Sequence, residues 1–140
     1  MVCLRRTLFL VLVAAAGAAG QTVACPATIT VTESAEATGG WRATPAQVPH
    51  LFERVSVLNG TQGGKEYDLA PDDEKAAGAA VVQTWFLKDY RSMNLFVRCR
   101  YHDTAVTLAM DLPVSMQTCT FTFELRKDGS VGGKSAAACR

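Results

Sequence analysis

Apolar and polar residues alternate along much of this chain, and the alternation predicts β-strands. The clearest case is the segment 119–125, in which every second residue is Cys, Phe or Leu and the others are Thr or Glu. Successive side chains of a strand point to opposite faces, so the Cys, the two Phe and the Leu are expected to share one buried face. The segment 81–87 is apolar on both sides, which is typical of a central strand.

Other segments repeat this period of two between turn residues. The run that begins at residue 51 is expected to project Leu51, Glu53, Val55 and Val57 to one side and to end at an Asn59-Gly60 turn. Residues 71–75 are predicted as a polar connection, and 76–80 as a helical turn weakened by its glycine. The predicted strands are 28–33, 51–58, 65–69, 81–87, 95–101, 105–110 and 119–125.

Short strands at close spacing, without a long amphipathic helix, predict a mainly β fold. We expect a small antiparallel sandwich or barrel of about seven strands, with 81–87, 95–101 and 119–125 at its centre. The segment 131–140 is too small and glycine-rich for its pattern to decide its structure. Such a fold hosts many functions, so it does not indicate an activity.

The first 20 residues have the pattern of a secretory signal peptide. Arg5 and Arg6 precede an apolar run, and small residues follow it, with cleavage at 20 or as late as 24. The apolar run is about 10 residues, roughly half of what a membrane span needs. Residues 21–140 are therefore expected to be a single soluble domain, periplasmic or secreted, stabilised by disulfides.

Removal of the signal leaves four cysteines, and an even number in an exported chain favours disulfide bonds. Lipidation of Cys25 is the alternative, but Thr22 fits a lipobox poorly. A fold-back about the turn 127–130 brings Cys119 almost opposite Cys139, which predicts the pairs Cys119–Cys139 and Cys25–Cys99. The main alternative pairs Cys99 with Cys119 and Cys25 with Cys139. Closing loops of about 21 and 75 residues stabilises by roughly 3 and 4.5 kcal/mol.

Charge argues against a nucleic-acid partner. Without residues 1–20 the chain keeps 12 basic and 13 acidic residues, and charges of both signs are scattered. Binding to nucleic acid depends on many Lys and Arg contacts to phosphates, and this chain has no basic stripe to supply them.

Two places have the residue types of a binding surface. On the second face of the strand 94–102, Phe96, Arg98, Arg100 and His102 are expected to line up. Arginines interleaved with an aromatic residue can hold a carboxylate or a glycan by bidentate hydrogen bonds and stacking. The alternative is cross-strand pairing with acids such as Glu124 or Asp103.

Trp41, beside Arg42 in a glycine-rich loop, is the second candidate contact. The alternative for this residue is that its ring plugs one end of the core.

The motifs of catalysis and metal binding are weak. "NGTQGGKE" and "DGSVGGKS" depart from the P-loop pattern, and both are interpreted as turns. His50 and His102 lack the spacing of zinc ligands, and His102 beside Asp103 is interpreted as a solvated turn. We therefore expect no cofactor, no metal and no catalytic residue.

An ordered set of short motifs resembles a family of small exported bacterial proteins with no assigned activity. These motifs are "ACP" at Cys25, "GW" at Trp41, "LFERVSVLNG", "YDLAPDDE", "WFL", "VRCRYHDTAVTLAMDLP" and "CTFTF". The resemblance covers most of the mature chain, and it implies export and this fold without a catalytic residue.

The function expected from these features is that of an exported, non-catalytic binding or envelope-interaction module, whose partner is an envelope protein or a glycan. An inhibitor of a secreted hydrolase is the alternative within binding. A minor periplasmic hydrolase is the alternative from another class.

Overall fold

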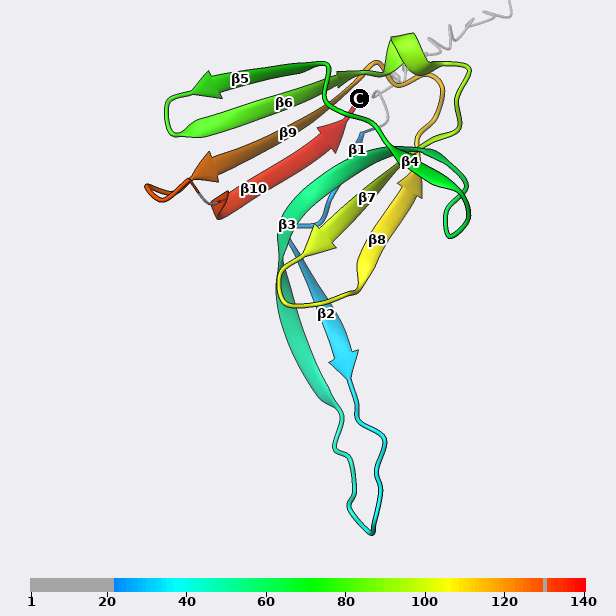
Figure 1. Ribbon diagram of the computed structural model, residues 1–140, viewed down its shortest axis with the longest axis vertical. Helices are drawn as coiled ribbons and strands as arrows, with labels where there is room; N and C mark the ends of the chain where they lie inside the picture. The colour runs from blue at the N-terminus through cyan, green and yellow to red at the C-terminus, as the bar shows by residue number, and fades with distance from the viewer. Residues whose placement is uncertain (1–21, 130) are drawn as a thin grey trace, which may run out of the picture.

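In the computed structural model, which describes residues 22–129 and 131–140, the chain is mainly β and antiparallel, as predicted (Figure 1). The described residues form ten strands and one short 3-10 helix, where about seven strands were expected. The elements are β1 (Val23–Ala24), β2 (Thr28–Glu33), β3 (Ala46–Gly60), β4 (Glu66–Asp68), β5 (Asp73–Ala77), β6 (Ala80–Phe86), η1 (Leu87–Tyr90), β7 (Leu95–Tyr101), β8 (Thr107–Asp111), β9 (Thr118–Leu125) and β10 (Val131–Cys139).

The strands form two sheets. The first has the order β1-β10-β9-β6-β5, so β6 and β9 lie inside it. The second has the order β2-β3-β7-β8, with the short β4 beside β3. The 15-residue β3 belongs to two structural regions, because its first half pairs with β2 and its second half with β7. Figure 1 shows β3 as a long curved strand that leaves the body of the molecule together with β2.

The core lies between the two sheets. In the first sheet, Trp85, Cys119 and Phe121 point inward from the central strands. Phe121 meets Phe52 of the second sheet edge to face, with ring centroids 5.9 Å apart, an arrangement that aromatic pairs prefer. The second sheet contributes Val55, Val57, Leu95, Val97, Cys99 and Tyr101.

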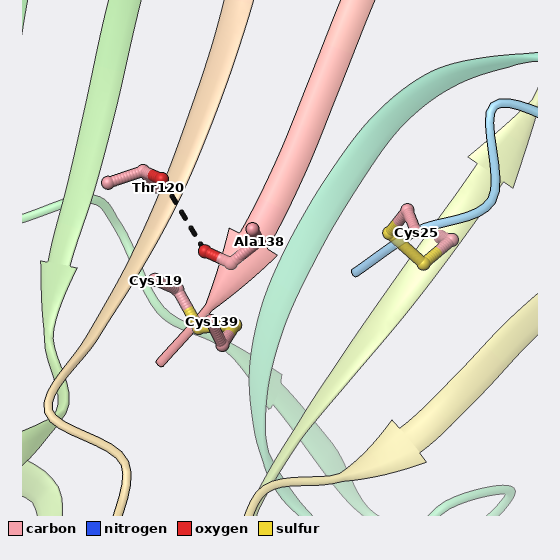
Figure 2. The surroundings of a disulfide bond; sticks show 6 residues. Cys25, Cys119, Thr120, Ala138 and Cys139 are labelled. Atoms are coloured by element: carbon pink, nitrogen blue, oxygen red, sulfur yellow. Dashed lines mark hydrogen bonds between the residues drawn. A yellow bond between two sulfur atoms is a disulfide. The ribbon is translucent and has the colours of Figure 1, made fainter. Parts of the chain in front are cut away.

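The two disulfides have the connectivity expected from the sequence (Figure 2). Cys119 lies directly opposite Cys139 on β9 and β10, and the adjacent Thr120 hydroxyl donates to the carbonyl of Ala138 at 3.4 Å. Cys25, between β1 and β2, is bonded to Cys99 of β7. The sulfur that lipidation would need is thus already part of a disulfide.

The expected face of the strand that begins at residue 51 is wrong in its first half. A bulge between Phe52 and Arg54 inserts one residue opposite β7 and changes the phase of the alternation. Phe52 is therefore buried and Leu51 exposed, whereas Val55 and Val57 point into the core as expected.

Two predicted turns are also wrong. Asn59 and Gly60 continue β3 and pair with β4, and the chain turns over 61–65. Residues 73–80 are not a polar connection and a helical turn: they form β5 and the start of β6, joined at Gly78, whose φ of +66° suits a tight hairpin. Pairing with β6 overrides the weak strand propensity of this charged, alanine-rich stretch.

Candidate functional site

The most prominent surface feature is an arm made of β2, the first half of β3 and the residues between them (Figure 1). Thr28 to Glu33 pair with Leu51 to Ala46 in an unbroken antiparallel register, so the two residue numbers of every pair add up to the same value. Thr38 and Trp41 keep the same sum, and the N–H of Trp41 donates to the carbonyl of Thr38 at 3.1 Å. Gly39 and Gly40 between them have φ of +59° and +83°, as a two-residue type I′ hairpin turn requires.

Trp41 follows this turn directly and is 83% exposed. The alternative that its ring plugs one end of the core is therefore wrong. Its neighbours 39, 40, 43 and 44 are small residues, so no bulky side chain flanks the indole except Arg42. Large apolar groups of this kind are costly to leave in water and are frequent anchors of protein interfaces.

The root of the arm is fixed to the body. Cys25, just before β2, is bonded to Cys99 of β7. His50 of β3 is buried, and its Nδ1 donates to the carbonyl of His102 at 2.8 Å. Further out, the side chain of Gln47 donates to the Thr32 hydroxyl across the two strands at 2.8 Å. A two-stranded hairpin alone is marginally stable in water, and these links hold this one in a defined position.

The second feature is the outer face of the second sheet, where Arg98 and Arg100 lie as expected on the face of β7 shared with Phe96. Arg98 binds Glu66 of β4 through two hydrogen bonds of 2.7 Å, and both side chains are less than a fifth exposed. The hydrogen bonds from Arg98, helped by the N–H of Gly63, lower the pKa of the Glu66 carboxyl. The acid that pairs with this face is therefore Glu66, not Glu124 or Asp103.

Arg100 has a different environment. It lies directly opposite Arg54 of β3, and like charges in that position destabilise a sheet. The Nε of Arg100 is buried without a hydrogen-bond partner, and neither arginine forms an ion pair with the described residues. The two side chains form an arginine pair, Arg54 with Arg100, that can bind a carboxylate from outside.

The remaining candidate, His102, does not extend this surface. It follows the end of β7, where its backbone N–H donates to the carbonyl of Leu51 at 3.0 Å and its carbonyl accepts from His50. The adjacent Asp103 has a φ of +57°, which places both residues in the turn to β8. The structure thus brings Arg98 and Arg100 together, leaves His102 at the root of the arm and places Trp41 at the arm's tip.

Arg54 and Glu66 were not identified from the sequence. Both belong to the surface around Arg98 and Arg100 only because β3 and β4 pair as they do. Strand pairing between distant segments leaves no local sequence signal. The one sequence hint is that Arg54 and Ser56 alternate with inward-facing valines.

The described residues contain no group of three or more His, Cys, Asp or Glu placed to hold a metal ion. All four cysteines of the described part are in disulfides. No helix within residues 22–129 and 131–140 has the length and apolarity of a membrane span.

Comparison with known proteins finds one curated relative in Azospirillum brasilense. It is described as an uncharacterised 16.3 kDa protein in the trpG 5′ region, and it is 34% identical over 142 residues that cover 95% of both chains. No solved structure matches. Residues 45–140 match the model of the type VI secretion system Tli immunity protein family, so the match begins with β3 and leaves β2 and the tip of the arm outside it. The relative fits the expected family of bacterial proteins without assigned activity, and the match over most of the chain shows that this protein belongs to the Tli immunity protein family.

Proposed function

We propose that this protein is an immunity protein that binds a type VI effector protein and thereby protects the cell that makes it. The family description supports an inhibitory, protective binding role. The observation that carries the proposal is the exposed Trp41 at the tip of an anchored arm. A rigid aromatic side chain that projects from a body it does not stabilise is suited to fill a pocket of another protein.

The arginine pair would supply a second, polar contact. Arg98 is neutralised by Glu66, whereas Arg54 and Arg100 have no acidic partner among the described residues. A carboxylate of the effector placed between them would relieve the repulsion of two facing cations. Such charge complementarity favours one partner over others more than it adds affinity.

We place this activity in the periplasm, with residues 1–20 as a removed signal peptide. Two disulfides support an oxidising compartment, because cytosolic thiols are kept reduced. The intact mass of the protein recovered from a periplasmic fraction tests this location. A chain that begins near residue 21, with no acyl group, agrees with it, and a retained residue 1 or an acylated Cys25 contradicts it.

Competition between strains of the bacterial host tests the function even when the effector has not been identified. A strain that lacks this protein should be outcompeted by its parent and should survive beside a parent whose type VI secretion is inactive. The wild-type gene should restore survival. Equal survival of the deletion strain beside both parents would contradict the proposal.

Variants connect the same assay to the arm. Trp41→Ala should fail to restore survival although the protein accumulates normally. Tyr67→Ala is the matched control, because Tyr67 is an exposed aromatic residue on β4 of the body. If both variants protect fully, the contact lies elsewhere on the surface.

A further inference from the structure

β8 has an unoccupied edge on its side away from β7. The N–H of Leu112 donates to the carbonyl of Leu95 at 2.9 Å, so in the antiparallel ladder Met110 and Leu108 also direct their backbone groups toward β7. The N–H and C=O groups of Thr107, Ala109 and Asp111 then point outward. Within the described part of the chain, no strand lies against them.

The side chains at this edge are only partly covered. Leu108 lies opposite Cys99 and Met110 opposite Val97, so both are on the face that packs against the first sheet. They are nevertheless 39% and 55% exposed, because the first sheet does not extend over β8. The unpaired backbone N–H and C=O groups of an open edge are a template for pairing with another strand, and exposed apolar side chains beside them favour that pairing.

β8 also lacks the features that protect sheet edges in other proteins. Its pairing with β7 has no bulge, it contains no Lys or Pro, and its single charge is at its last residue. By contrast β5, the edge strand of the other sheet, carries Asp73, Glu74 and Lys75. Charged edge residues discourage strand addition, so β8 is open to it and β5 is not.

The geometry points to a second copy of this chain as the occupant, in a two-fold symmetric dimer that pairs β8 with β8. With the two-fold axis at Ala109, the backbone N–H and C=O groups of Ala109 in one copy bond to those of Ala109 in the other. The backbone groups of Thr107 bond in the same way to those of Asp111 in the other copy. Leu108 then lies opposite Met110 of the other copy in the pair type with the closest side chains. Leu108 thus meets Met110, and the Thr107 hydroxyl meets the Asp111 carboxylate. The Oδ1 of Asp111 already accepts a hydrogen bond from Gln62 of its own chain at 2.8 Å, so the hydroxyl would bond to the other carboxylate oxygen.

The dimer joins the two copies of the second sheet into one continuous sheet. It does not depend on the proposed immunity function, since it involves neither the arm nor the arginine pair. The contact area of one short strand is small, so the dimer should form and dissociate with concentration.

Light scattering coupled to gel filtration over a range of concentrations tests this inference on the full mature chain. The mass should rise from that of a monomer toward twice that value. Ala109→Pro should abolish the rise, with at least about tenfold weaker association, because proline removes an outward N–H and blocks the edge without removing a bond to β7. Val114→Lys, which charges an exposed apolar residue outside β8, should leave association unchanged.

Met110→Lys provides a second test that keeps every backbone donor. It should also weaken association, and circular dichroism should show that each variant keeps the β fold. A wild-type chain that stays monomeric at all concentrations would overturn the inference. A dimer that persists in both β8 variants would place the contact elsewhere and overturn it as well.

Discussion

The arm and the body of this protein bury their side chains to very different extents. Five of the seven residues of β7 in the body are buried, whereas none of the six residues of β2 in the arm is. The body has two sheets around a common core, but beyond its root, where Ile29 and His50 meet the body, the arm is a single pair of strands exposed to water. The arm contributes little to the stability of the body, and its surface is available for contact with a partner.

The largest expected effect concerns the covalent link between these two regions. Replacement of Cys25 and Cys99 together by Ala should lower the free energy of unfolding by about 4.5 kcal/mol, because the bond closes a long loop. Urea unfolding measures this loss. Amides of the arm should also exchange faster in hydrogen-exchange experiments.

The matched variant replaces Cys119 and Cys139 by Ala. Its loop is shorter, so the expected loss is about 3 kcal/mol, and amides of the arm should exchange as in the wild type. If this variant loosens the arm as much as the first, the arm's position does not depend on the Cys25–Cys99 bond.

The next effect is confined to the body. Phe121→Ala should lower the free energy of unfolding by about 3 to 5 kcal/mol, because it removes a buried ring that packs against Phe52. Thr122→Ala, on the opposite face of the same strand, should cost far less in the same urea titration. Similar losses at the two positions would contradict the described register of β9.

A smaller effect depends on pH. The pKa of Glu66 is lowered in the folded state, mainly by its hydrogen bonds from Arg98. The pair therefore stabilises the fold fully at pH values above the carboxyl's usual pKa of 4.5. This contribution should disappear as pH falls through the lowered pKa. Thermal unfolding of wild type and Glu66→Gln should therefore differ most near neutral pH and converge in acid. A constant difference across pH would mean that the charge of Glu66 is not what stabilises this face.

The smallest effect on stability is expected at Trp41, the most exposed large hydrophobic residue in the described part of the chain. Trp41→Ala should change the free energy of unfolding by no more than about 0.5 kcal/mol, because the indole has almost no contact with the body. Loss of protection without loss of stability would separate contact from folding in this protein. A large loss of stability would show instead that the arm folds back onto the body.

The sequence predicted best the strands whose alternation is strict. The bounds of β2 and β7 agree with the predicted segments, and the inward face of β9 is right for Cys119 and Phe121. Leu125 at its end is exposed, because the strand continues beyond the core. The pairing of Cys119 with Cys139 was predictable because a short turn brings β10 back beside β9. The exact register was not, because it shifts by two between Val131 and Ser135, and without this shift Cys119 would lie opposite Ala137.

Other features depend on contacts between distant segments. The bulge after Phe52 and the pairing of Arg98 with Glu66 both arise from the way β3 meets β7 and β4. The exposure of Trp41 could not be decided either, because a tryptophan in a glycine-rich loop has the same local sequence whether it is buried or exposed. Only the arrangement of strands distinguishes the two.

The constant register of the arm has a consequence for its reach. Each residue of an extended strand adds about 3.3 Å, and successive side chains face opposite ways. Shortening both strands by one residue would thus bring Trp41 closer to the body and turn its ring to the other side, whereas shortening both by two would change the distance alone. The reach of the arm and the direction of Trp41 can therefore change in separate steps, so the chain can be fitted to pockets of different depth while the second half of β3 and the core remain as they are.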